Sequence, residues 1–269
     1  ASLAPASDLR GGAAFCPGDA TRNRLTAVRS TTARSGATTG DRSPDRRQQA
    51  PAGPVGEHAL TVTGLVKHWG STAAVDGLDL TVPHGSVVAL LGPNGAGKTT
   101  TVEICEGFRR PDQGQVRVLG LDPVADSDAL RSRIGVMLQG GGAYTGARAE
   151  EMLRLCASYY VDPIDPRWLL DVLGLRDAAR TSVRRLSGGQ QQRLALGCAI
   201  VGRPELVFLD EPTAGLDAHA RIMVWELIDR LRADGVSVLL TTHMMDEAEE
   251  LSDRVVIIEW ESMQAARSF

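Results

Sequence analysis

The stretch that decides the fold is residues 92–100, Gly-Pro-Asn-Gly-Ala-Gly-Lys-Thr-Thr. It matches the pattern G-x-x-x-x-G-K-[ST] through Gly92, Gly97, Lys98 and Thr99. An apolar run at 86–91 precedes this loop, and residues 99–107 favour a helix. A strand, a glycine-rich loop and a helix in this order predict a loop that wraps a polyphosphate. The alternative is a glycine-rich turn that matches by chance, and the flanking elements argue against it.

The residue types of this loop suit phosphate chemistry. Backbone N–H groups reach a polyphosphate only where no side chain blocks the approach, which explains the glycines. The start of a helix adds free N–H groups and partial positive charge. Lys98 can reach the terminal phosphates, and the Thr99 hydroxyl can join the shell of a Mg²⁺ ion. The residues expected to bind a nucleotide here are Gly92, Pro93, Asn94, Gly95, Ala96, Gly97, Lys98, Thr99 and Thr100.

Composition sets limits on the class of protein. The 269 residues are 43% hydrophobic, which is ample for a core, and the net charge of −4 argues neither for nor against nucleic acid. No apolar run approaches the roughly 18 residues of a membrane span. If the protein works at a membrane, another polypeptide must therefore span it. The four cysteines are scattered, which favours reduced thiols over disulfides or a zinc site.

The chain divides by pattern into a tail, a core and an insert. Residues 1–56 are poor in regularly spaced apolar residues and predict a disordered tail. Alternation at 59–66 and 77–82 predicts a small antiparallel sheet. Residues 140–186 predict a helical insert with helices at 147–160 and 166–173, the first with Met152, Leu153, Leu155 and Cys156 on one face.

The remaining stretches alternate between strand and helix. Strands are expected at 115–119, 134–138, 206–209, 236–240 and 255–258, and helices at 126–133, 190–201, 218–233 and 245–251. Continuous apolar strands between helices are typical of a parallel sheet with both faces covered. The predicted fold class is α/β, with a P-loop core built on a mostly parallel sheet, an N-terminal antiparallel β lobe and a helical insert.

Two carboxylates follow the apolar strand at 206–209. Asp210 suits the shell of a metal ion, and Glu211 suits the polarisation of an attacking water. Both are expected at the carboxyl edge of the sheet, where the glycine loop also lies and where open α/β sheets bind ligands. The alternative is a strand that simply ends in polar residues.

A second anion site is predicted at Leu186-Ser-Gly-Gly-Gln190, where a hydroxyl and two glycines open a helix. With the phosphate loop before it and the carboxylates after it, this segment resembles the signature of ATP-binding cassette (ABC) ATPases. The resemblance covers residues 58–258, so the predicted ATPase domain is 57–258.

The resemblance implies roles for further residues. Trp69 takes the place of the family's adenine-stacking aromatic, with an ordinary core aromatic as the alternative. Gln139 resembles the glutamine that contacts Mg²⁺ or water, with a polar strand end as the alternative. Asp217 belongs to a loop that crosses the dimer interface, and His243 resembles the histidine that contacts the γ-phosphate. The implied ligands are ATP and Mg²⁺, with the metal at Thr99, Gln139 and Asp210 and hydrolysis at Lys98, Glu211 and His243.

In the family, two ATPase units associate head to tail around ATP. The loop of Lys98 in one unit and the loop of Ser187, Gly188, Gly189 and Gln190 in the other would close on one nucleotide. The implied partners are a second copy of this chain and a separate membrane permease, without nucleic acid. The implied location is the cytoplasmic face of the cell membrane, with membrane contact only through the permease.

The runs at 107–114, 120–123 and 241–246 resemble the sequences of single-cassette subunits of bacterial drug and antibiotic exporters. Alternatives are an importer ATPase, a soluble translation or repair ATPase, and a non-catalytic nucleotide-gated module. A single cassette without sustained heptads argues against a translation or repair ATPase. The presence of Glu211 and His243 argues against a non-catalytic module. Residues 259–269 lack the turn and strand expected next, which predicts a truncation or a shifted reading frame.

Overall fold

The protein is described from a computed structural model that places residues 56–137 and 144–258. The tail expected at 1–56, apart from its last residue, the atypical segment 259–269 and Gln139 therefore lie outside the described residues. The described strands are β1 (His58–Trp69), β2 (Thr72–Pro83), β3 (Val87–Leu91), β4 (Gln113–Val118), β5 (Ile134–Met137), β6 (Leu206–Asp210), β7 (Ser237–Thr242) and β8 (Arg254–Ile257). The described helices are α1 (Lys98–Cys105), α2 (Ser127–Arg131), α3 (Ala149–Ala157), α4 (Pro166–Val172), α5 (Gly188–Ile200), α6 (Ala218–Ala233) and α7 (Met245–Leu251), with a 3₁₀ turn at Val183–Arg185.

The predicted antiparallel lobe is confirmed as a three-stranded sheet in the order β2-β1-β4. Leu60 on the central strand pairs with Val82 on one side and with Val118 on the other. Alternate residues of β2 are buried at Leu78, Leu80 and Val82, because one face of this sheet packs against the core. The central strand β1 also buries two adjacent pairs, Ala59-Leu60 and Leu65-Val66. Both strands run longer than the predicted segments, and their pairing contains several shifts of register.

The second sheet has five strands in the order β5-β6-β7-β3-β8, and all of its pairs are parallel. Asp210 pairs with Thr241, and Leu91 pairs with Thr242. The ends of β3, β6 and β7 therefore meet at one edge of the sheet. This edge carries the glycine loop, the two carboxylates and the segment that leads to His243.

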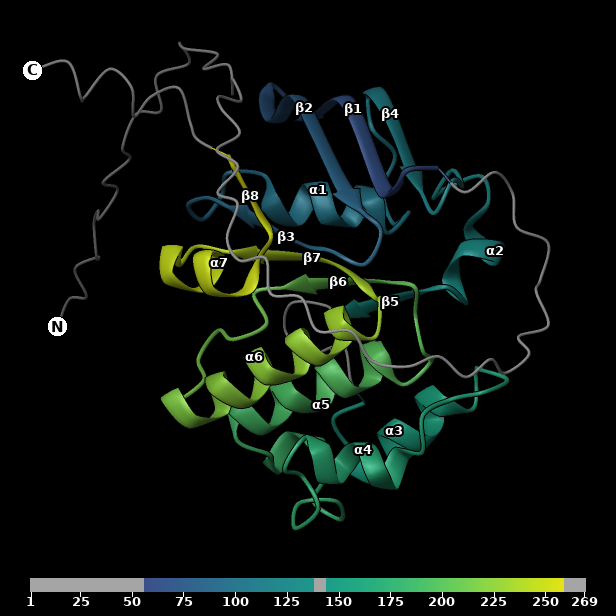
Figure 1. Ribbon diagram of the computed structural model, residues 1–269, viewed down its shortest axis with the longest axis vertical. Coiled ribbons are helices and arrows are strands. Elements are labelled where there is room, and N and C mark those ends of the chain that lie inside the picture. Colours follow the sequence, from purple (N-terminus) through teal and green to yellow (C-terminus); the bar gives the residue numbers. More distant parts are fainter. Residues whose placement is uncertain (1–55, 138–143, 259–269) are drawn as a thin grey trace, which may run out of the picture.

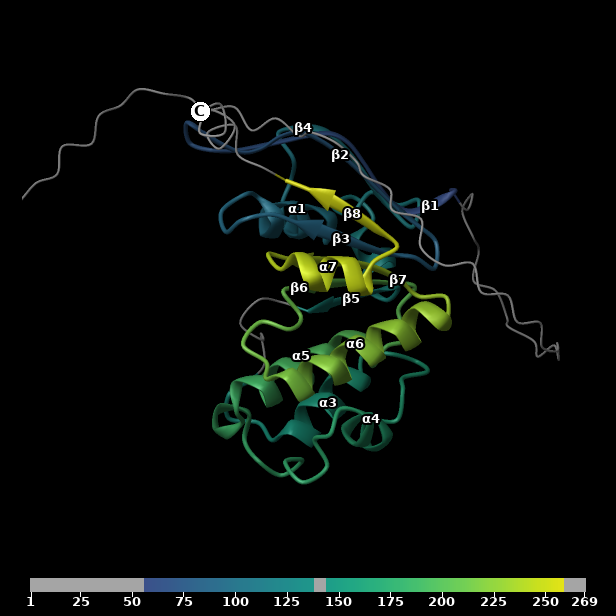
Figure 2. The same ribbon diagram turned by 60° about the vertical axis from the view of Figure 1, so that its left-hand side comes forward.

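Two hydrophobic cores cover the faces of the parallel sheet. Between the two sheets lies α1, whose Val102 and Ile104 pack with strand residues of both. On the opposite face α5 and α6 cover the sheet, with α3 and α4 beyond them (Figure 1; Figure 2). Each predicted helix of the insert is present, although both are shorter than expected.

One detail of the insert was predicted wrongly. Leu155 is 37% exposed, whereas Leu153 is fully buried. The buried residues of α3 are Ala149, Leu153 and Ala157, which are spaced by four and so share one face. Leu155 is two positions from Leu153, so it turns away by about 200° on a helix of 3.6 residues per turn. In the described residues, no helix combines the length and apolar character that a membrane crossing requires.

Candidate functional site

The glycine loop between β3 and α1 has a backbone that side chains would obstruct. Gly95 and Gly97 have φ of 84° and 92°, in the left-handed region that glycine adopts most readily. A Cβ on Gly97 would lie 2.2 Å from the carbonyl oxygen of Ala74. No side chain caps the start of α1, so the loop and helix together offer N–H groups to a bound anion.

Lys98 is the buried cation of this loop. Its side chain is 5% exposed, and its Nζ donates to the carbonyl oxygens of Gly92 at 2.8 Å and Pro93 at 3.1 Å. The same Nζ lies 3.9 Å from Glu211 Oε1. Burial lowers the pKa of Lys98, and the nearby carboxylates of Glu211 and Asp210 oppose that shift. The ammonium is thus held at the rim of the loop with acidic neighbours beside it.

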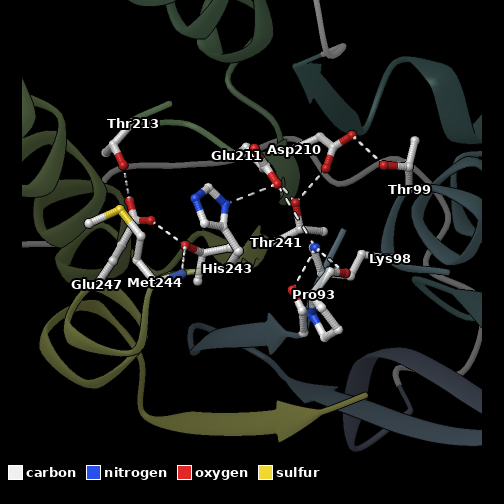
Figure 3. Close-up of polar contacts among 12 residues, drawn as sticks. Pro93, Lys98, Thr99, Asp210, Glu211, Thr213, Thr241, His243, Met244 and Glu247 are labelled. Carbon is white, nitrogen blue, oxygen red and sulfur yellow. Dashed lines mark hydrogen bonds and ion pairs between the residues drawn. The ribbon is translucent and has the colours of Figure 1, made fainter. Parts of the chain in front are cut away.

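Asp210 joins the end of β6 to the start of α1. Its carboxylate is buried and accepts hydrogen bonds from Thr99 Oγ1 at 3.1 Å and from Thr241 Oγ1 (Figure 3). A hydroxyl and a carboxylate in contact form an oxygen donor set of the kind that Mg²⁺ prefers. Two of the three residues predicted to bind metal are therefore adjacent, while Gln139 lies outside the described residues.

Glu211 occupies a sharp turn directly after β6. Its φ of 49° lies in the left-handed region, which is uncommon for a residue with a side chain. The turn is held by its N–H, which donates to Thr241 Oγ1 at 3.0 Å, and by its carbonyl, which accepts from Gln192 Nε2 at 2.8 Å. Its Oε1 lies 3.3 Å from His243 Nδ1. This turn is why Asp210 faces Thr99 while Glu211 faces His243.

Trp69 is not a core aromatic, since its side chain is 47% exposed at the end of β1. The guanidinium carbon of Arg109 lies 4.6 Å from the ring centroid, and Lys67 Nζ lies 5.9 Å from it. The ring lines a cavity of about 410 Å³. The other residues of the cavity wall include Thr72, Asn94, Gly97, Lys98, Thr99 and Glu211. Asp210 and His243 adjoin the cavity through their contacts with Thr99 and Glu211.

The loop that opens α5 is not part of this cavity wall. Ser187 caps the helix: its Oγ accepts from Gln190 N at 3.2 Å, and Gln190 Oε1 accepts from Ser187 N at 2.9 Å. Asp217 similarly caps α6, accepting from Ala220 N at 2.8 Å. Within one copy of the chain, these predicted site residues and Gly188 and Gly189 are therefore separate from the cavity that holds Lys98.

Several residues at the site were not singled out from the sequence. Thr241 contacts both Asp210 and Glu211, Arg109 covers the ring of Trp69, and Glu247 contacts Thr213 and Thr242. Apart from the local contact of Glu247 with Thr242, these contacts join segments that only the fold brings together. The one sequence signal was position, because Thr241 and Thr242 directly follow the strand predicted at 236–240.

Comparisons with known proteins agree with the geometry of this site. The sequence model described as ABC transporter matches residues 75–214, which is more than half of the chain. The chain belongs to the ABC transporter family. Its solved neighbours include an ATP-binding subunit of an ABC transporter, with 27% identity over 76% of this chain and 88% of that one and a TM-score of 0.69. Another is a dimeric bacterial ABC transporter cassette, with 25% identity over 75% of this chain and 96% of that one and a TM-score of 0.67.

Curated relatives of this ABC chain include a drug-resistance ATP-binding protein and an export ATP-binding protein. It is 42% identical over 206 residues to the daunorubicin/doxorubicin resistance ATP-binding protein DrrA of Streptomyces peucetius. It is also 42% identical over 208 residues to the Nod factor export ATP-binding protein I of Sinorhizobium fredii. Each match covers 75% of this chain, and it covers 62% of the first relative and 60% of the second. The chain thus spans less than two thirds of the length of these two proteins.

Proposed function

We propose that this chain binds ATP with Mg²⁺ and hydrolyses it to ADP and phosphate. We further propose that it is the ATP-binding subunit of a transporter that exports a drug, antibiotic or other hydrophobic compound through a separate membrane permease. One observation carries the ATPase proposal. Lys98, the adjacent pair Asp210 and Glu211, and His243 come from three separate segments and converge on one edge of the parallel sheet.

In this proposal the triphosphate lies in the glycine loop. The backbone of residues 92–97 and the start of α1 supply N–H donors, and Lys98 supplies the charge for the terminal phosphates. Adenine stacks on Trp69, whose exposed ring lines the same cavity as the glycine loop. Thr99 and Asp210 would hold Mg²⁺, and Gln139 remains a third predicted ligand. A bound Mg²⁺ would supply charge neutralisation for the phosphates.

Hydrolysis then depends on how Glu211 holds a water molecule. As general base or orienting group, its carboxylate accepts a proton from the water as that oxygen attacks the γ-phosphorus. His243 is in contact with the carboxylate and is proposed to contact the γ-phosphate. Lys98 stabilises the charge that develops on the phosphate oxygens. The strained backbone at Glu211 fixes where its carboxylate lies.

We also propose a head-to-tail homodimer. The Ser187 loop carries an anion-binding helix start that the cavity of its own chain does not use. A partner copy could add Ser187, Gly188, Gly189 and Gln190 to the open side of the cavity, with Asp217 at the interface. The dimeric cassette among the structural neighbours supports this arrangement. The proposed domain organisation is one cassette at 57–258 with a helical insert at 140–186.

The relatives' names favour export over import or a non-transport role. The proposed place is the inner face of the cell membrane, bound to the permease. An adjacent open reading frame that encodes a six-span membrane protein would support this, and a cassette gene that stands alone would argue against it.

The ATPase proposal is tested with Glu211→Gln. The variant keeps the shape of the side chain but removes the base, so ATP binding should persist while turnover falls by at least about a hundredfold. Dimers that require ATP should then accumulate in size-exclusion chromatography. The matched control is Glu226→Gln, an exposed position on α6. Unchanged hydrolysis by Glu211→Gln would overturn the base assignment.

A further inference from the structure

Among the described residues, one carboxylate that the proposed mechanism does not use is almost completely buried. Glu247 on α7 is only 2% exposed. Its Oε1 accepts from Thr213 Oγ1 at 2.5 Å, and its Oε2 accepts from Thr242 Oγ1 at 2.5 Å (Figure 3). No ion pair with Glu247 is found within 56–137 and 144–258. Both oxygens are satisfied by neutral hydroxyl groups alone.

The two threonines belong to the two segments that carry Glu211 and His243. Thr213 lies two residues after Glu211, at the start of the loop that leads to Asp217. Thr242 ends β7 and immediately precedes His243. Glu247 therefore bridges the segment that carries the proposed base and the segment that carries the histidine beside it.

Thr242 extends the bridge in two further directions. Its Oγ1 accepts from Met244 N at 3.0 Å while it donates to Glu247, which fixes the turn around His243. Its carbonyl oxygen accepts from Gly92 N at 3.3 Å, which joins the same turn to the start of the glycine loop. A shift of Thr242 would thus move the phosphate loop and His243 together.

Joining two loops through a buried carboxylate costs desolvation free energy. Removing a charge from water carries a large penalty that two hydroxyl donors offset only in part. Its advantage is geometric, because an ionised carboxylate only accepts and short charge-assisted hydrogen bonds fix both donors at once. An apolar residue of similar size would fill the space without fixing the two threonines relative to each other.

We infer that Glu247 is a positioning residue for hydrolysis: it ties the turn of His243 to the loop after Glu211 and so keeps these two side chains in contact. Glu247 touches neither nucleotide nor water in this scheme. The inference rests on the proposed ATPase activity and adds to it the residue that sets the geometry of the Glu211–His243 pair.

The test compares Glu247→Gln with Glu249→Gln, a control at an exposed position of the same helix. An amide cannot accept both hydroxyl hydrogens in the same way, so kcat should fall about tenfold or more while the Kd for ATP stays within about threefold. Thr213→Val removes one of the two hydrogen bonds with little change of shape and should give a smaller loss of kcat. Melting temperatures of all variants are measured in parallel.

A double variant separates positioning from simple stability. If Glu247 acts through His243, then Glu247→Gln should cause little further loss of kcat once His243→Ala is present. Multiplicative losses in the double variant would overturn the inference. It would also fail if Glu247→Gln and Thr213→Val lower the melting temperature yet turn over at the wild-type rate below it. A wild-type protein that hydrolyses no ATP would instead contradict the proposed function itself.

Discussion

At the scale of single residues, Trp69 depends on a neighbour that the sequence does not place beside it. Arg109 lies over one face of the ring, and its guanidinium is in turn paired with Glu103. A cation held in this way stabilises the orientation of the indole, whose exposed ring lines the cavity. Arg109 should therefore affect how well the ring is prepared for adenine without taking part in hydrolysis.

This leads to a prediction for Arg109→Leu. We expect the KM for ATP to rise about threefold with kcat unchanged, because the lost interaction supports binding and not the reaction. Trp69→Ala should raise KM further, by about tenfold, if stacking is the main contact with the base. Steady-state ATPase assays at several ATP concentrations measure both. A fall in kcat with constant KM in either variant would contradict the stacking role.

A second residue-scale prediction concerns Glu106, at the end of α1. Burial raises the pKa of Glu106 from 4.5 to about 8, and the carboxylates of Asp210 and Glu103 add to the shift. Between these two pKa values the folded state binds a proton that the unfolded state has released. The free energy of unfolding should therefore fall as the pH rises from about 4.5 to 8, and should level off above that range.

Urea unfolding at pH 5 and pH 9, in EDTA and without nucleotide, measures the Glu106 effect. Glu106→Gln should flatten this part of the pH profile and be more stable than the wild type at pH 9 by at least about 1 kcal/mol. Glu249→Gln is the control for loss of an exposed carboxylate. If the free energy of unfolding changes with pH in the same way for wild type and Glu106→Gln, then this carboxyl does not cause the pH dependence.

At the scale of elements, the glycine loop is a strand-to-helix connection that has no room for a side chain at Gly97. Gly97→Ala combines a left-handed backbone with a Cβ 2.2 Å from a backbone oxygen of β2. We expect it to destabilise the fold by about 2–4 kcal/mol and to abolish ATP binding. Thermal unfolding and isothermal titration calorimetry test both effects.

The control for this loop prediction is Gly146→Ala. A Cβ at that position meets nothing within 4 Å, and its φ lies outside the left-handed region. It should leave both stability and ATP binding near the wild-type values. Equal effects of the two substitutions would mean that the loop geometry described above is not what requires glycine.

Local patterns predicted the elements well, because periodicity and capping act over a few residues. The helix at 218–233 agrees with α6 at both ends, and the Ser187–Gln190 spacing appears as a capping box. The long-range pairs could not be predicted in the same way. Glu247 stands in the acidic run of residues 246–250, which on sequence alone resembles a solvated helix face. Only the packing of α7 against the sheet buries it beside Thr213, 34 residues away.

At the scale of the whole molecule, the two predicted anion sites lie apart within one chain. The Lys98 loop lines a cavity that the Ser187 loop does not reach, yet both have helix starts suited to phosphate. In the proposed dimer, a two-fold axis relates the two copies, so each cavity would receive the Ser187 loop of the other copy. A complete site would then need one intact loop of each kind, contributed by different chains.

Complementation between two inactive variants tests this arrangement. Lys98→Ala removes the cation from one half of the site, and Ser187→Arg blocks the other half with a bulky side chain. Each variant alone should be inactive, since both of its composite sites contain a defect. When the two are mixed, every heterodimer contains one site with an intact Lys98 loop facing an intact Ser187 loop, so hydrolysis should return to at most about a quarter of the wild-type rate after random exchange.

The decisive control is a mixture of Lys98→Ala with Lys98→Ala/Ser187→Arg, which can form no intact site. Recovery in the first mixture but not the second would require the Ser187 loop to act across the interface, whereas no recovery despite demonstrated heterodimer formation would mean that the loop serves only as the cap of α5.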